Sequence, residues 1–353
     1  MNQEQLLNLC EAAHNAPSAD NSQPWRFIVS TDKITIIYDT PRVLNKTFAA
    51  DNIATRISMG SVVESIAQTC VEHKIKFTVD TSPIISNGIT SYARFSFDQK
   101  LLEKFTLKKT STASIRHTNR FAYKDQQPSN QDVEALIDKL NVDSTNIKWI
   151  EDRDYIKDIA TLIKTASEIR FQTPQVHEWL MQSLRFGTRQ DTEDGLHIST
   201  LDLPPLGGAF MKFITPWERT AFLNKVGMYK LMAAIEAQPI SNAPGLMSFS
   251  CKNTPQAQLQ AGRDSFKLWA ALNKIGLAVH PYFVITDQIT RLHNNIVPKN
   301  LIPLARRLEE ETHKLFNLEA EENICMILRV GYPKKQAVRS RRLNFMDVVS
   351  IED

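Results

Sequence analysis

The most informative stretch of the chain is residues 16–27, which read Ala-Pro-Ser-Ala-Asp-Asn-Ser-Gln-Pro-Trp-Arg-Phe. Two prolines restrict the backbone on either side of a polar turn. Between them Ser18, Asn21 and Gln23 supply short side-chain donors and acceptors. A helical pattern over residues 3–14 precedes the turn, so the sequence predicts a helix that leads into an edge strand. An ordinary polar turn that hydrogen-bonds its own backbone would use the same residue types.

Alternating and helical patterns extend outward from this turn. They predict strands over 25–29, 33–38, 75–79 and 91–97, with a long helix over 52–73. Residues 98–115 form a basic connection rich in Ser and Thr, which is typical of a boundary. We therefore expect a first unit over residues 1–110 and a second over residues 111–353.

The second unit shows the same mixture of helical and strand patterns. The predicted helices begin after Ser129 and cover 153–170, 256–275 and 301–316, and the predicted strands cover 245–251, 277–285 and 324–330. Residues 171–245 show a weak pattern and many aromatic and methionine side chains. This stretch is either core packing or a lid over a binding site.

A faint internal repeat links the two units. Met59-Gly60 and Ala261-Gly262 each stand about fifteen residues before an apolar strand. A repeat this weak is only slight evidence for a duplication.

Composition excludes several classes of protein. Only 11 of the 353 residues are glycine, and neither G-x-G-x-x-G nor G-K-[ST] occurs, which argues against a Gly-rich phosphate loop. The 42 basic and 39 acidic residues give a net charge of +3, too balanced to indicate a nucleic-acid binder. We expect no signal peptide, no membrane span and a cytoplasmic location.

The four cysteines give no metal or disulfide signal. They stand at positions 10, 70, 251 and 325, without C-x-x-C spacing and in or beside apolar stretches. This pattern favours buried, reduced thiols, so we expect neither a metal site nor disulfides.

Two further segments are rich in arginine. Residues 116–123 read Arg-His-Thr-Asn-Arg-Phe-Ala-Tyr, and two guanidinium groups with a hydroxyl between them can hold a phosphate. Residues 331–342 run from Gly-Tyr-Pro to Arg-Ser-Arg-Arg. A solvated linker and a disordered cationic tail are the ordinary alternatives. Apolar residues return over 343–349, however, which predicts that the tail docks on the body of the protein.

Taken together, the three motifs resemble those of the nitroreductase family of FMN flavoproteins. The Pro-Ser turn, the Arg-rich opening and the Gly-Tyr-Pro strand with its basic tail each have a counterpart in that family. Their order differs here, because the Pro-Ser turn precedes the Arg-rich opening by about 100 residues. This order is similar to that of the fused, single-chain, Acg-type branch. The resemblance implies an α+β, nitroreductase-like fold of two similar halves that form an internal pseudo-dimer.

The resemblance also implies a cofactor site. Family members bind FMN between two subunits, and this chain has one Arg-rich opening and one Pro-Ser turn, on different halves. We therefore expect one complete FMN site and one degenerate site per chain. The cofactor-binding residues carried over are Arg116, His117, Thr118, Arg120, Ser18, Ala19, Asn21, Gln23, Leu277, Ala278, His280, Arg339 and Arg341. This chain has Gly276-Leu277-Ala278 where ordinary members have Gly-Leu-Gly, which counts against a backbone contact to flavin N5. A core position for His280 is at least as compatible with the sequence as a place beside the flavin.

The implied activity is NAD(P)H-dependent two-electron reduction of a small electron-poor acceptor, such as a nitroaromatic or a quinone. No catalytic side chain is predicted, because the flavin carries the chemistry. The alternative is a non-enzymatic flavin-binding or flavin-storage protein whose lid seals the site. The acceptor, the choice of nicotinamide cofactor and any further homodimer formation stay open.

Overall fold

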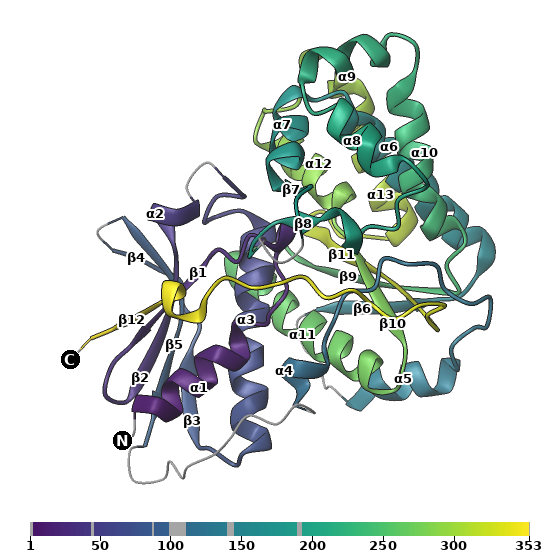
Figure 1. Cartoon of the computed structure of the whole chain (residues 1–353). Coiled ribbons are helices and arrows are strands. Elements are labelled where there is room, and N and C mark those ends of the chain that lie inside the picture. The colour runs from purple at the N-terminus through teal and green to yellow at the C-terminus, as the bar shows by residue number, and fades with distance from the viewer. Residues whose placement is uncertain are drawn as a thin grey trace.

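Two β-sheets lie side by side, with a pair of long helices packed between them (Figure 1). The computed structural model describes residues 3–43, 46–86, 88–98, 111–139, 145–188 and 193–352. The two long helices are α3 (Ile53–Glu72) and α11 (Pro255–Lys274). Each begins with a side-chain cap, because Asn52 accepts from Ala54 N–H and Thr254 accepts from Ala257 N–H.

The two halves of the chain share one topology. The first runs α1 (Gln3–Ala13), β1 (Trp25–Val29), β2 (Lys33–Tyr38), α3, β3 (Phe77–Asp80), β5 (Ile89–Phe97). The second runs α5 (Asn130–Lys139), β6 (Asn146–Ile150), β9 (Gly245–Lys252), α11, β10 (Ala278–Tyr282), β11 (Glu322–Gly331). The sheet orders are β1-β2-β5-β3 and β6-β9-β11-β10, and every neighbouring pair in both is antiparallel. The predicted α+β fold of two similar halves is confirmed.

Each half carries its own additions. In the first sheet, β4 (Ile84–Ser86) pairs with β5, and β12 (Val349–Ile351) from the C-terminal tail pairs with β1. Short helices α2 (Thr40–Val43) and α4 (Thr112–Ile115) accompany it. In the second half, α12 (Val284–His293) and α13 (Ile302–Phe316) stand between β10 and β11. Figure 1 shows the C-terminal tail crossing from the second half to the first.

A helical insert separates β6 from β9 in the second half. It comprises α6 (Arg153–Phe171), α7 (Pro174–Ser183), β7 (Leu184–Arg185), β8 (Leu196–His197), α8 (Gly207–Phe213), α9 (Trp217–Asn224) and α10 (Met228–Ser241). Its own small core includes Met181, Leu184, Leu196 and Ile214. The insert therefore accounts for many of the aromatic and methionine residues that gave no clear pattern.

The faint repeat in the sequence marks the contact between the long helices. Both helices have 20 residues, and Gly60 and Gly262 each occupy the eighth position. A Cβ on Gly60 would lie 2.0 Å from the Leu259 carbonyl oxygen, and one on Gly262 would lie 2.2 Å from the Ile57 carbonyl oxygen. The two backbones touch where only glycine leaves room. Equivalent positions of the two halves thus meet each other, as in a symmetric dimer.

The structure corrects two of the predicted elements. The strand expected over 277–285 ends at Tyr282, and the helix α12 begins at Val284. A continuous apolar run does not separate a strand from a buried helix, so the pattern could not place this boundary. Strand β6 was not predicted, because it is only five residues long and exposed on alternate positions. Most of the connection expected over 98–115, including the boundary near residue 110, lies outside the described residues.

Within the described part of the chain, no helix is long and apolar enough to cross a membrane.

Candidate functional site

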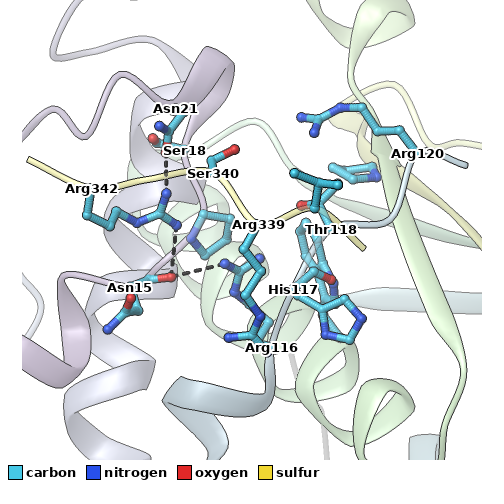
Figure 2. Close-up of a pocket in the computed structure, with 14 residues that line it drawn as sticks. Asn15, Ser18, Asn21, Arg116, His117, Thr118, Arg120, Arg339, Ser340 and Arg342 are labelled. Carbon is cyan, nitrogen blue, oxygen red and sulfur yellow. Dashed lines mark hydrogen bonds between the residues drawn. The ribbon is translucent and has the colours of Figure 1, made fainter. Parts of the chain in front are cut away.

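Three segments that are far apart in the sequence line one cavity between the halves (Figure 2). They are the turn between α1 and β1, the segment that begins at Arg116, and the C-terminal tail. The lining residues are Asn15, Pro17, Ser18, Asn21, Arg116, His117, Thr118, Arg120, Trp269, Pro281, Val338, Arg339, Ser340 and Arg342. The structure therefore brings together the three segments that the sequence motifs singled out.

The turn between α1 and β1 has an unusual backbone. Asp20, Asn21 and Gln23 have φ angles of 49°, 56° and 50°, in the left-handed region that residues other than glycine rarely adopt. Ser18 Oγ accepts a hydrogen bond from Gln23 N–H at 2.9 Å. Gln23 Nε2 donates to the carbonyls of Asn21 and Glu193 at 3.2 and 3.0 Å. Strain of this kind persists only where the surroundings hold it, and it is frequent at binding sites.

The C-terminal tail is held against this turn. Asn21 Nδ2 donates to the Arg341 carbonyl at 3.0 Å, and Gln23 Oε1 accepts from Leu343 N–H at 3.0 Å. His14 Nε2 lies 2.9 Å from the Leu343 carbonyl. The tail therefore has a defined position, which fixes where its arginines lie.

Arg116 is the buried centre of the site. Its side chain stacks on Trp269 with its guanidinium carbon 4.8 Å from the ring centroid, and the residue is 6% exposed. Nη2 donates to the Asn15 carbonyl at 3.0 Å, whereas Nε and Nη1 have no partner. Burial lowers the pKa of Arg116 well below its usual value, and the neighbouring Arg342, Arg339 and Arg120 lower it further.

Arg342 is a charged neighbour of Arg116 and also lines the cavity. It donates to the carbonyls of His14, Asn15 and Ala16 at 3.1 Å each, and to Asn21 Oδ1. Burial lowers its pKa to about 10. Within the described residues, neither Arg116 nor Arg342 forms an ion pair. A buried guanidinium beside a partly exposed one, neither of them paired with a carboxylate of the described residues, is suited to an anion.

Asp20, in the turn between α1 and β1, contacts the helical insert. Its Oδ2 lies 3.5 Å from Ser183 Oγ at the end of α7. Burial raises the pKa of Asp20, although the charges of Arg170 and Arg120 oppose this rise. Burial also lowers the pKa of Arg120, which lines the cavity.

Several predicted site residues lie elsewhere. Arg341 is exposed and does not line the cavity, and Arg342 takes that place. Gln23 is fully buried, and its amide is used to hold the turn and the tail. Ala19 does not line the cavity either.

The residues predicted at the start of the strand β10 do not line the cavity. Leu277 and Ala278 are 2% and 1% exposed. His280 lies on the opposite face of the strand from Pro281, the residue that lines the cavity, because successive side chains alternate. Burial lowers the pKa of His280 well below its usual value, so the imidazole is neutral. Four lining residues were not among the predicted site residues: Asn15, Trp269, Pro281 and Arg342. Arg342 stands within the quoted tail motif, and Asn15 directly precedes the Pro-Ser turn.

The cavity fits a phosphate group better than a whole flavin. Its volume is about 100 Å³, well below the roughly 300 Å³ at which ordinary ligand pockets begin. The partnerless donors of Arg116 fit the phosphate end of FMN. A flavin ring needs more room than this cavity has. Among the described residues no cluster of three or more His, Cys, Asp or Glu side chains could hold a metal.

The fold and the cavity together define a class of protein: two similar α+β halves with an arginine-lined cavity between them. The nitroreductase family model matches residues 1–73, which contain the Pro-Ser turn. Over these residues the chain is similar to the nitroreductase family, as the motifs predicted.

Individual relatives are distant. The curated relative "Uncharacterized protein MT1398" of Mycobacterium tuberculosis (strain CDC 1551 / Oshkosh) is 21% identical over 345 residues, which is 95% of this chain and 46% of that protein. The chain thus spans about half the length of the curated relative it matches. Iodotyrosine deiodinase bound to FMN and 3-iodo-L-tyrosine is 15% identical, with a TM-score of 0.37 over 66% of this chain and 94% of that one. The FMN-dependent nitroreductase NfnB of Mycobacterium smegmatis with NADPH is 13% identical, with a TM-score of 0.39 over 67% and 95%.

Proposed function

We propose that this protein is an FMN-binding flavoprotein with one composite FMN site per chain. The observation that carries the proposal is Arg116, a buried guanidinium with two partnerless nitrogens beside Arg342. Neither arginine pairs with a carboxylate in the part of the chain that the structure describes. A phosphate would provide the missing negative charge and the missing acceptors. The nitroreductase family match over residues 1–73 supports FMN as its source.

We assign a role to each group of the cavity by its position. Arg116, Thr118 and Arg342 would hold the phosphate, with Arg339 beside them. Arg120 also lines the cavity, where the charge of Asp20 acts on it. A cation there would stabilise negative charge on the reduced ring. Gln23 and Asn21 would act indirectly, because their amides fix the turn and the tail.

We propose as its activity the NAD(P)H-dependent two-electron reduction of a small electron-poor acceptor, such as a nitroaromatic or a quinone. The bound flavin would supply the hydride chemistry. The chain's own contribution would be to bind the cofactor, to set the charge around it and to limit access of solvent.

The second candidate function is flavin binding or storage without turnover. One observation favours it: the insert already touches the turn of the site. Gln23 Nε2 donates to the Glu193 carbonyl at 3.0 Å, and Gly195 N–H donates to the Asn21 carbonyl at 3.4 Å. An insert held in this way would act as a lid that keeps acceptors out.

Two measurements test these proposals in order. The absorption spectrum of the purified protein, with FMN added where necessary, should show a bound flavin. NAD(P)H oxidation is then followed with a nitroaromatic and with a quinone. Turnover supports the reductase, and bound FMN that NAD(P)H does not reduce supports storage. A protein that takes up no FMN contradicts both.

A further inference from the structure

A second cavity, of about 560 Å³, lies at the end of the second sheet. It is lined by residues of the segment 122–127, the start of α6, the end of α10, and Arg329 on β11. No residue lines both cavities. Arg329 is the cross-strand neighbour of His280, on the face of the sheet opposite to that of Pro281. This second cavity is therefore separate from the arginine cluster described above.

Arg329 is a buried cation without a counter-charge. It is 3% exposed, and its guanidinium carbon lies 4.0 Å from the centroid of the Tyr123 ring. Nη2 donates to the carbonyls of Arg120 and Phe121 at 3.2 and 2.7 Å, whereas Nε is buried without a partner. Arg329 forms no ion pair with any described residue. Carbonyls and a ring face supply only partial negative charge, and buried arginines are normally paired.

Two more cations line the same cavity. Arg153, at the start of α6, donates to the carbonyls of Ala243 and Ser241 at 2.7 and 3.0 Å. Lys334, on the tail, is exposed. Neither forms an ion pair within the described part of the chain. Three positively charged side chains thus line one cavity, and the buried one, Arg329, has an N–H without an acceptor. Such a set is suited to an anion with several acceptor oxygens.

The rest of the lining favours an organic ligand over a bare ion. The carboxylates of Asp125 and Asp202 are exposed, and Gln238 and Asn242 add two amides. Carboxylates accept hydrogen bonds from hydroxyl groups, whereas they repel an isolated anion. The volume also lies within the range of about 300–1,000 Å³ that is usual for ligand pockets.

We propose that this second cavity binds the phosphate of a small hydroxylated phosphate ester. The phosphate lies against Arg329, Arg153 and Lys334, and the hydroxyl groups point to Asp125 and Asp202. This site does not rest on the proposed flavin function, because it uses another face of the sheet and other residues.

Isothermal titration calorimetry at low salt tests the proposal on the full chain with FMN added in excess. Glycerol 3-phosphate is the probe, and glycerol is its uncharged match. We expect one molecule of glycerol 3-phosphate to bind per chain and glycerol not to bind. Arg329→Gln should weaken binding at least tenfold, and Lys334→Gln a few-fold. Arg307→Gln, an exposed arginine paired with Glu311, is the matched control and should change nothing.

Arg116→Gln separates the two cavities. It should leave the binding of glycerol 3-phosphate unchanged, whatever it does to the flavin. No binding of the probe at millimolar concentration overturns the proposal, and so does equal binding of glycerol. A third outcome would also overturn the proposal: Arg116→Gln abolishes the binding of glycerol 3-phosphate and Lys334→Gln does not change it. That result would place the ester in the first cavity. Lys334→Gln changes an exposed side chain, so it carries the test if Arg329→Gln does not fold.

Discussion

At the scale of single residues, the first site is governed by buried charge. Arg116 and Arg342 are held by carbonyl oxygens and by the Trp269 ring, and no described carboxylate pairs with either of them. This arrangement costs free energy in the empty protein, because a desolvated cation is only partly compensated. An arriving phosphate would recover that free energy as binding affinity.

Arg116→Met should therefore weaken FMN binding without lowering the stability of the FMN-free protein. We expect the apparent affinity for FMN to fall at least tenfold, which corresponds to about 1.4 kcal/mol. The urea midpoint of the FMN-free protein should stay the same or rise, because a buried uncompensated charge is removed. Flavin fluorescence titration and urea unfolding measure the two effects. A variant that binds FMN like the wild type would contradict the role of Arg116.

His14 links pH to the docking of the tail. Trp25 Nε1 donates to His14 Nδ1 at 3.2 Å, so the neutral ring carries its proton on Nε2, facing the Leu343 carbonyl. Burial lowers the pKa of His14 to about 4, with a smaller opposing effect of the Leu343 carbonyl. Protonation of His14 Nδ1 would direct its new N–H at the Trp25 Nε1–H, and the hydrogen bond between the two side chains would be lost.

The free energy of unfolding should consequently fall as the pH falls from about 6.5 to about 4, because the unfolded chain binds a proton that the folded chain does not. A lowering of this size corresponds to at most about 3 kcal/mol. His14→Gln offers the same donor and acceptor without the titration, so its slope over this range should be shallower. Equal slopes for the two proteins in urea unfolding would contradict this assignment.

At the scale of elements, the contact of α3 with α11 joins the two halves. Glu64 on α3 is 2% exposed at its side chain and pairs with Arg263 and Lys267 on α11, at 3.0 and 3.7 Å. Ser61 Oγ donates to the Gly262 carbonyl at 3.2 Å. These polar contacts fix the register of the two helices around the glycine crossing.

Gly60→Ala and Gly262→Ala should each destabilise the protein by about 2 kcal/mol or more, because the new methyl group meets backbone atoms that cannot move aside cheaply. Gly187→Ala is the matched control, since no heavy atom lies within 4 Å of the position of its Cβ and its φ is not positive. Urea unfolding of the three variants measures the difference. Equal midpoints for Gly60→Ala and Gly187→Ala would show that the helices do not cross as described.

At the scale of the whole molecule, the chain resembles a symmetric dimer that has lost its symmetry. The halves share strand order and long helices, but only the second carries the helical insert between its first two strands. The tail adds β12 to the first sheet. The C-terminal tail thus lies against both the segment that begins at Arg116 and the Pro-Ser turn.

We expect one FMN per chain at saturation. The sequence contains one Arg-rich opening, at residues 116–123, and one Pro-Ser-x-x-Asn-x-Gln-Pro-Trp motif, at residues 17–25, and these are the parts of one composite site. Flavin absorbance after release by denaturation, divided by protein concentration, measures the ratio. Two FMN per chain would show that the second half binds flavin through other residues.

Most regular elements could be predicted from the sequence, because apolar periodicity follows from which face of an element is buried. Strands β1 and β2 agree with their predicted bounds, and α3 and α11 agree to within one residue at each end. The helix α12 and the part of the insert that follows α6 were not predicted in this way. Their apolar residues do not distinguish strand from helix until the neighbouring elements are in place.

What the sequence by itself determined was the chemistry of the site: arginines, a threonine and a strained polar turn on different parts of the chain. Only the tertiary structure decided that Arg342 and not Arg341 lines the cavity, that Gln23 holds the tail, and that Arg329 lines a second cavity. The physical reason is distance along the chain. Asn21 and Arg341 are 320 residues apart and are joined by a hydrogen bond of 3.0 Å. A local pattern records which side chains are present, whereas the packing of distant segments decides which of them face one another.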